Sequence, residues 1–299
     1  MVDDASADDS ASIAAEHADV VLRSEQSEGA AAARNRGAAV ADAELLLFVD
    51  ADVVVRGEAI GVLVGRIADG WDACFGAYGA LPPPSCRNAP TLFKNLQQHW
   101  THTTAANPVR SFWSGLGIVR ADAFDAVGGF DLRATRGADV EDIDLGYRLD
   151  RAGFRICQAP AALGDHHKRY GLFQMVRSDV MHRAVPWVRT MARTGRGHAE
   201  LNLAPAALAA ALSLLLGLGA AGAIVGRGPS LFRGVTLAAG LCGWLAAHLR
   251  FFHFAITTAG ARGLVVVPLQ LLYGIYAPLG GALGLAAAVA DRMRRRAGL

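Results

Sequence analysis

The stretch "LLLFVDADVVV", residues 45–55, places two carboxylates, Asp50 and Asp52, inside an otherwise apolar run. A strand that is apolar on both faces is typical of the centre of a parallel sheet, where an ionised carboxylate is unfavourable unless it is paired or bound to a cation. Because side chains alternate along a strand, Asp50 and Asp52 would point the same way if the backbone stays extended. The stretch therefore predicts either that the buried strand ends at Val49 or that the two acids bind a shared partner.

Strand and helix patterns alternate on the N-terminal side of this stretch. The sequence predicts the end of a short helix at residues 11–18, a strand at 20–22, a helix opening on glycine at 29–40 and a strand at 45–49. This order is typical of an α/β domain with a largely parallel sheet, in which ligands bind outside the carboxyl ends of the strands. Both "VDD", residues 2–4, and "VDAD", residues 49–52, lie where a strand would end.

Net charge and cysteine spacing argue against several classes of protein. The net charge of +2 over 299 residues gives no general attraction to nucleic acid, and we expect no nucleic-acid partner. The four cysteines form no C-x-x-C pair, so neither a zinc site nor a disulfide framework is indicated. A catalytic region in a reducing cytosol fits this pattern.

The C-terminal third is apolar, and after Asn202 the chain contains a single acid, Asp291. We expect a catalytic domain at residues 1–200, a membrane region of two to four helices at 203–290 and a basic cytoplasmic tail at 291–299. Residues 203–225 are uncharged, and a helix of that length, at ~1.5 Å per residue, crosses a ~30 Å hydrocarbon core. Residues 234–247 are shorter and run into "HLRFFHF", which suits a membrane interface. Residues 263–290 contain Pro268 and Pro278 and form either one tilted helix or two shorter pieces.

Arginines flank this region at both ends, so the positive-inside rule predicts a multi-pass cell-membrane protein with both flanks and the catalytic domain in the cytoplasm. An even number of crossings follows, two or four, although there are three apolar segments. The alternative is a buried helical core in a soluble protein. The N-terminus has no signal-peptide pattern, so targeting would come from the C-terminal part. The chain also begins inside what looks like a strand end, from which we expect the natural gene to start further upstream.

Five segments resemble the nucleotide-sugar-dependent glycosyltransferases of family 2: "VDDASADDS", "EGAAAARNRGAAVA", "LLLFVDADV", "FWSGLGIVRADAFDAVGGFD" and "EDIDLGYRLDRAGFRI". The resemblance covers about residues 2–170. It implies the A-type, Rossmann-like fold of the nucleotide-diphospho-sugar transferases, followed here by C-terminal transmembrane helices. The family's first strand, which helps to hold the nucleotide, is missing from this sequence.

On the donor side, the resemblance implies that Asp3 and Asp4 contact the base and ribose. A carboxylate can accept hydrogen bonds from the N–H groups of a base and from the hydroxyl groups of a ribose. The alternative is that Asp4 caps the following helix. Arg34, behind the glycine-opened helix start, would face the diphosphate together with Asn35, or would simply be an exposed helix residue.

Asp50 and Asp52 resemble the family's D-x-D, in which Asp50 also contacts the donor and both acids hold a divalent cation, Mg²⁺ or Mn²⁺. Acids that merely end a strand are the alternative. In "GDHHKRYGL", His166 would join the metal or diphosphate shell and Lys168 would lie near the phosphates, unless both belong to an ordinary polar turn.

On the acceptor side, the resemblance implies that Asp142 of the "ED" pair is the general base, with Glu141 beside it. A helix-N-terminal acid stabilised by the dipole is the alternative. Asp144 and Arg148, four residues apart, read as a surface ion pair. Trp113 is either a sugar-stacking platform or a core residue, and Gly115 allows close approach at the acceptor pocket.

The function implied is inverting transfer of a sugar from a nucleotide-diphosphate donor to an acceptor hydroxyl or a lipid phosphate. The partners would be the donor, a lipid-linked or glycan acceptor of the cell envelope, and membrane lipids. Two alternatives stay open: a processive polysaccharide synthase, although its "Q-x-x-R-W" pattern is absent, and a non-catalytic membrane scaffold with a degenerate transferase fold.

Overall fold

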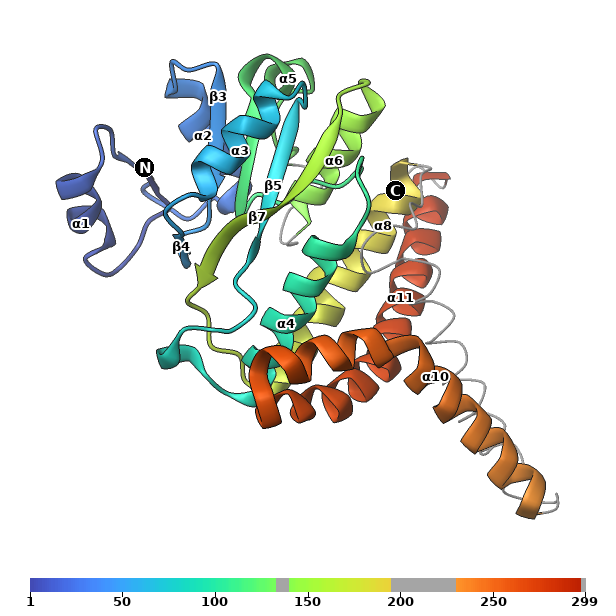
Figure 1. Cartoon of the computed structure of the whole chain (residues 1–299). Coiled ribbons are helices and arrows are strands. Elements are labelled where there is room, and N and C mark those ends of the chain that lie inside the picture. The colour runs from blue at the N-terminus through green and yellow to red at the C-terminus, as the bar shows by residue number, and fades with distance from the viewer. Residues whose placement is uncertain (133–139, 195–229, 297–299) are drawn as a thin grey trace. The chain divides into compact units, whose positions relative to one another are not determined.

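The computed structural model of the protein describes residues 1–132, 140–194 and 230–296 (Figure 1). The chain forms two compact units, and neither is continuous in sequence. The first unit comprises Met1–Ala77 and Ala106–Gly164, and the second comprises Tyr78–Ala105 and Asp165–Leu299. The domain boundary expected near residue 200 lies outside the described residues and stays a prediction.

The elements up to residue 126 are β1 (Val2–Asp3), α1 (Ser10–His17), β2 (Leu22–Arg23), α2 (Ala30–Val40), β3 (Leu45–Val49), β4 (Val53–Val55), α3 (Ala59–Ala68), β5 (Ala73–Tyr78), the 3₁₀ turn η1 (Pro84–Cys86), α4 (Ala89–Thr104), β6 (Leu116–Arg120) and α5 (Ala121–Ala126). The later ones are α6 (Glu141–Arg151), β7 (Ile156–His166), α7 (Leu172–Arg177), the π-helical η2 (Ser178–Ala184), α8 (Val185–Thr194), α10 (Ser230–Ala259), the 3₁₀ turn η4 (Gly260–Val265) and α11 (Val266–Arg296).

The main sheet has five strands in the order β3-β6-β5-β7-β4, and β1 and β2 form a separate parallel pair. Strand β6 runs antiparallel to both of its neighbours, β3 and β5, with Leu45 opposite Arg120 and Val49 opposite Leu116. The sheet is therefore mixed, and the expectation of a largely parallel sheet is wrong around β6. A strand buried on both faces has the same apolar composition in either direction, so its sequence does not reveal its direction.

Strand β3 is covered on both faces, as its sequence predicts. Leu46 and Phe48 belong to one core cluster, in which the Phe48 ring centroid lies 5.5 Å from that of Phe124 and 5.3 Å from that of Phe130. Leu45 and Leu47 pack against a second cluster on the opposite face. The alternation of side chains along the strand thus fills two apolar layers.

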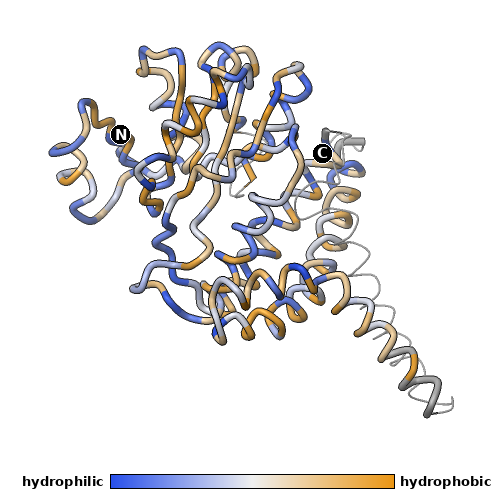
Figure 2. The backbone as a smooth tube through the Cα atoms, in the orientation of Figure 1, coloured by the Kyte–Doolittle hydropathy of each residue, from blue (hydrophilic) through white to orange (hydrophobic). Residues whose placement is uncertain are grey.

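The second unit consists mainly of helices. Its core gathers aromatic and aliphatic side chains of α4, α10 and α11, among them Phe93, Leu96, Trp244, Phe252 and Val266. Hydrophobic residues run along both α10 and α11 (Figure 2). Helix α11 continues through Pro278 as one element, so the last apolar segment of the sequence forms one helix.

Within the described ranges, one helical stretch, Ala238–Arg294, is long and apolar enough to cross a membrane by length and composition. The 3₁₀ turn η4 interrupts it between α10 and α11. The segment at residues 203–225, expected to cross the membrane, lies outside the described residues.

Candidate functional site

The two acids of the opening stretch lie on a turn. Strand β3 ends at Val49, the chain turns over residues 50–52, and Val53 begins β4. The Val53 amide donates to the Asp50 carbonyl at 3.0 Å, and the Asp50 amide donates to the Gly115 carbonyl at 3.2 Å. The expectation that the buried strand ends at Val49 is confirmed, and both carboxylates stand at the carboxyl end of β3 outside the sheet core.

Arg34 of α2 connects this turn to the start of α6. Its Nη2 lies 2.5 Å from Asp50 Oδ1, and its Nη1 lies 2.7 Å from Glu141 Oε1. The guanidinium carbon lies 5.6 Å from the centroid of the Phe130 ring. All three charged side chains are largely covered, with 15%, 30% and 12% of Arg34, Asp50 and Glu141 exposed, so these charge-assisted hydrogen bonds are little screened by water.

Asp142 occupies the first turn of α6. Its Oδ2 accepts from the Ser114 amide at 3.4 Å, and its Oδ1 accepts from the Ile143 amide at 2.7 Å. Burial and the neighbouring Glu141 carboxylate raise the pKa of Asp142 to about 7, although Arg34 acts to lower it. A carboxylate whose pKa lies near neutrality is well matched to proton abstraction.

Two glycines allow this arrangement. A Cβ on Gly146 of α6 would lie 2.3 Å from the Phe112 nitrogen, so only glycine lets α6 approach that backbone. A Cβ on Gly115 would lie 2.4 Å from the Trp113 ring, which therefore lies over residue 115. The Gly115 carbonyl accepts from the Asp50 amide, and the Ser114 amide donates to Asp142. Residues 114–115 therefore contact both the Asp50 turn and Asp142.

Residues 1–116 match the sequence model described as Glycosyl transferase family 2. This part of the chain is therefore similar to the family 2 glycosyltransferases. With its mixed sheet, the first unit has the A-type fold of the nucleotide-sugar transferases.

Two curated proteins similar to this chain are pre-mycofactocin glycosyltransferases of Mycobacterium tuberculosis, from strains CDC 1551 and H37Rv. Each is 31% identical over 159 residues, a match that covers 51% of this chain and 33% of the relative. The chain thus spans about a third of the length of these curated relatives.

Two solved structures resemble this chain more distantly. One is a mannosyltransferase from Pyrobaculum calidifontis in complex with GDP-Man and Mn²⁺, with 16% identity, a TM-score of 0.49, and coverage of 98% of this chain and 76% of that one. The other is GalNAc-T7 with UDP, GalNAc and Mn²⁺, with 18% identity, a TM-score of 0.40, and coverage of 57% and 36%.

Asp4 holds the segment that leads into α2. Its Oδ2 accepts from Ser27 Oγ at 2.7 Å and from the Gly29 amide at 2.8 Å. Its Oδ1 accepts from the Glu28 amide at 2.8 Å. Burial alone would raise the pKa of Asp4, but these hydrogen bonds lower it. Asp4 therefore fixes the start of α2, the helix that carries Arg34. It does not cap α1, the helix that follows it in the sequence.

Asp3 and Asn35 are also held by neighbouring groups. Asp3 is buried, accepts from the Ser6 amide at 3.2 Å and forms an ion pair with Arg23 at 3.2 Å. The Asn35 amide group donates to the Phe130 carbonyl and accepts from the Phe130 amide, both at 2.9 Å. Asn35 thereby positions the aromatic ring that lies beneath Arg34.

The expectation that Asp144 and Arg148 form a surface pair is wrong in one respect. The ion pair is present, at 2.8 Å, but Asp144 is buried. Arg148 also donates to the Val127 carbonyl at 2.7 Å. The spacing of four residues predicted the pair, and only the packing of α6 against the core shows that it is internal.

His166 and Lys168 belong to the second unit. The His166 ring stacks on that of Tyr78, with centroids 4.0 Å apart and an interplanar angle of 8°, and Lys168 Nζ lies 5.6 Å from the Tyr170 ring centroid. The described residues contain no group of three or more His, Cys, Asp and Glu side chains gathered for a metal ion. Asp50 and Asp52 alone still suit Mg²⁺ or Mn²⁺, because such ions are commonly held by one or two carboxylates together with substrate phosphates.

Sequence reasoning does not identify Phe130 and Gly146 as site residues, and it does not predict the hydrogen bond between Ser114 and Asp142. Ser114 acts through its backbone amide, which leaves no signature in the sequence. Phe130 and Gly146 lie inside motifs that were recognised, "GGFD" and "DLGYRL", but their roles depend on contacts across the fold.

Proposed function

We propose that this chain transfers a sugar from a nucleotide-diphosphate donor to an acceptor hydroxyl or lipid phosphate, with inversion at the anomeric carbon and dependence on a divalent cation. The observation that supports this most is the Arg34 bridge between Asp50 and Glu141. Through this bridge Arg34 connects the turn with Asp50 and Asp52, which suit a metal ion, to Glu141. The neighbour of Glu141 is Asp142, whose pKa lies near neutrality.

On the donor side, Asp50 and Asp52 would hold Mg²⁺ or Mn²⁺, and Arg34 would pair with phosphate oxygens. When bound, the cation neutralises charge that develops on the departing nucleoside diphosphate. Asp4 supports this side by fixing the entry to α2, and Asp3 lies at the end of β1, where the family places the base and ribose.

On the acceptor side, Asp142 would accept the proton of the attacking hydroxyl. The Ser114 amide donates to its carboxylate, and Arg34 pairs with the neighbouring Glu141. One base without a second carboxylate acting as nucleophile favours direct displacement, which inverts the anomeric carbon. Trp113 lies next to Ser114 and is a candidate surface for the acceptor sugar.

We also propose a place for this reaction at the cytoplasmic face of the cell membrane, with a lipid-linked or glycan acceptor. The support is the length and composition of α10 and α11 and the arginines that flank the apolar region.

Two matched variants test the separate roles of the acids. Asp52→Asn should weaken Mn²⁺-dependent donor binding and abolish transfer, whereas Asp142→Asn should abolish transfer and leave donor binding unchanged. Donor binding is measured by calorimetry with and without Mn²⁺, and transfer by product release from a panel of nucleotide sugars. Asp125→Asn, an exposed acid outside the site, is the control. Equal loss of donor binding in the two site variants would contradict the assignment, and a long-chain product would favour the synthase alternative.

A further inference from the structure

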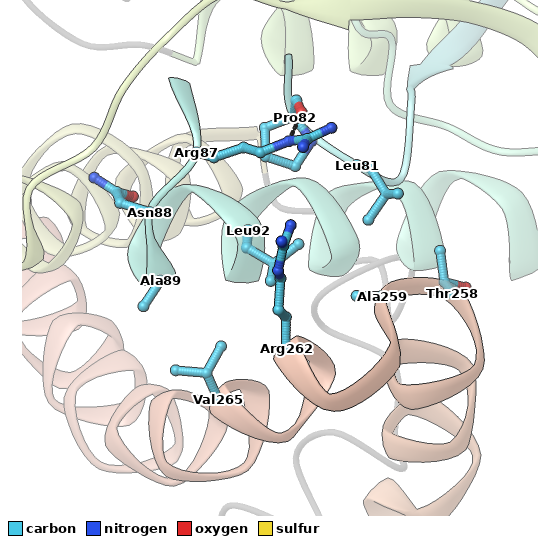
Figure 3. A pocket seen from close by; sticks show the side chains of 10 residues that line it. All are labelled: Leu81, Pro82, Arg87, Asn88, Ala89, Leu92, Thr258, Ala259, Arg262 and Val265. Atoms are coloured by element: carbon cyan, nitrogen blue, oxygen red, sulfur yellow. Dashed lines mark hydrogen bonds between the residues drawn. The ribbon is translucent and has the colours of Figure 1, made fainter. Parts of the chain in front are cut away.

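The second unit contains a cavity of about 570 Å³ that the transferase site does not use. Its ten lining residues come from residues 81–92, from the end of α10 and from η4 (Figure 3). The lining is mostly apolar, with Leu81, Leu92 and Val265 among its members. A cavity of this size and character is large enough for a small amphiphilic molecule.

Two arginines line this apolar cavity, Arg87 and Arg262, and the lining contains neither Asp nor Glu. Arg87 donates to the Pro82 carbonyl at 3.4 Å. In the described part of the chain neither guanidinium has a carboxylate partner. Both arginines are exposed, so their guanidinium groups can pair with one anion beside the apolar lining.

The turn that carries Arg262 is built tightly. Gly260 has a φ of +62°, and a Cβ on Gly263 would lie 2.3 Å from the Ala255 carbonyl oxygen. The turn η4 therefore folds back closely on the end of α10. In Figure 3 the Arg262 side chain extends from this turn across the cavity toward the segment with Pro82 and Arg87. The guanidinium thus projects from a fixed backbone.

We propose that this cavity binds an anionic lipid, with its phosphate headgroup between Arg87 and Arg262 and the first part of its hydrocarbon chain against Leu81, Leu92 and Val265. The two arginines supply the bidentate donors that phosphate oxygens accept. The apolar lining supplies contact that a free phosphate would not use. Helices α10 and α11 carry long apolar runs and are joined by η4, the turn that contains Arg262, which favours a lipid surface as the source of the anion.

Binding of dioctanoyl phosphatidic acid to the purified full-length chain in amphipol tests the proposal. Glycerol 3-phosphate carries the head alone and dioctanoylglycerol the tails alone, so the three titrations separate a lipid site from an anion site. We expect only the complete lipid to bind well, and Arg262→Gln and Arg87→Gln each to weaken it by about tenfold or more. Arg250→Gln removes an exposed arginine of α10 outside the cavity and should leave the affinity unchanged.

Three outcomes would overturn the proposal: no binding of the complete lipid, equally tight binding of glycerol 3-phosphate, or the same loss of affinity in Arg250→Gln. Thermal unfolding of each variant checks that the fold is retained. The measurement uses no nucleotide sugar and no turnover, and Asp52→Asn and Asp142→Asn should bind the lipid as the parent does. Failure of lipid binding is therefore distinguishable from failure of the proposed transfer reaction.

Discussion

At the scale of a single residue, opposing electrostatic influences act on the pKa of Asp142. Its enclosure and the adjacent Glu141 favour the protonated carboxyl, whereas Arg34 favours the carboxylate, and the resulting pKa is about 7. Arg34 is shared with Asp50 and Glu141, so its charge is already offset on both sides. A carboxyl group with this pKa changes its charge near neutral pH.

The first prediction concerns the pH dependence of transfer. If Asp142 is the base, it acts as the carboxylate, so the rate should rise with pH through about 7 and level off above it. Initial rates at low and saturating donor, from about pH 5.5 to about pH 8.5, measure this profile. A rate that is flat across this range, with the chain folded throughout, would exclude Asp142 as the titrating base.

The second prediction concerns stability. Because the pKa of Asp142 is raised above the ordinary value of 3.8, the folded state binds the proton more tightly than the unfolded chain. Its contribution is therefore most favourable below about pH 4 and is lost as the pH rises through about 7. Asp142→Asn should raise the melting temperature at pH 8 by a few degrees, on the order of 1 kcal/mol, and should change it little near pH 4. Melting curves at both pH values, with Asp125→Asn as control, measure the effect, and an equal shift at the two pH values would argue against it.

At the scale of the element, the apolar run from Leu45 to Val55 divides into two strands. The end of β3 at Val49 was predictable, because an unpaired carboxylate is unfavourable inside a sheet. The position of β4 was not predictable: it lies at the opposite end of the strand order from β3, although only three residues separate them. The sequence pattern indicates how long a strand is and which of its side chains are buried. Which strand pairs with it depends on segments distant in the sequence, as β7 is for β4.

The third prediction concerns the seating of α6. Gly146→Ala would place a Cβ 2.3 Å from the Phe112 nitrogen and force α6 away from residues 111–112. We expect a loss of stability of about 1–3 kcal/mol and a larger loss of kcat than of donor affinity, because α6 carries Asp142. Thermal unfolding, calorimetry with donor and initial rates measure the three effects.

Gly61→Ala in α3 is the matched control, since its added Cβ would meet nothing within 4 Å. There the substitution should stabilise the chain by about 0.5–1 kcal/mol, because alanine favours the helix over glycine. If Gly146→Ala behaves like Gly61→Ala, the close packing of α6 is not what positions the carboxylate.

At the scale of the whole molecule, the second unit is held together by contacts that the sequence does not reveal. Lys94 Nζ lies 2.7 Å from Asp179 Oδ1, and the Tyr276 hydroxyl donates to Asp179 Oδ2 at 2.6 Å. These partners are 85 and 97 residues apart in the chain, so no local spacing relates them. The apolar composition of α11 was evident from the sequence, but its polar attachment through Tyr276 to η2 and α4 was not.

The fourth prediction follows from this buried network. Lys94 and Asp179 are both buried, and burial alone would raise the pKa of Asp179, but the Lys94 ammonium lowers it below its ordinary value. The stability that Asp179 contributes is therefore present above about pH 4 and is lost as the pH falls further. Lys94→Met leaves a buried carboxylate without its cation and should cost about 3–5 kcal/mol at neutral pH, whereas Tyr276→Phe should cost about 1–3 kcal/mol.

The double variant Lys94→Met with Asp179→Leu removes both charges, and it should be more stable than Lys94→Met alone, because no uncompensated charge remains in the interior. Lys168→Met is the control, since Lys168 is the other lysine of the sequence and is exposed. Thermal unfolding of the full-length variants in amphipol, at neutral pH, gives the order of stabilities. If Lys94→Met is no less stable than Lys168→Met, the pair does not hold α4 to η2, and the stability of the second unit comes from its other contacts, such as those of Phe93, Leu96 and Trp244.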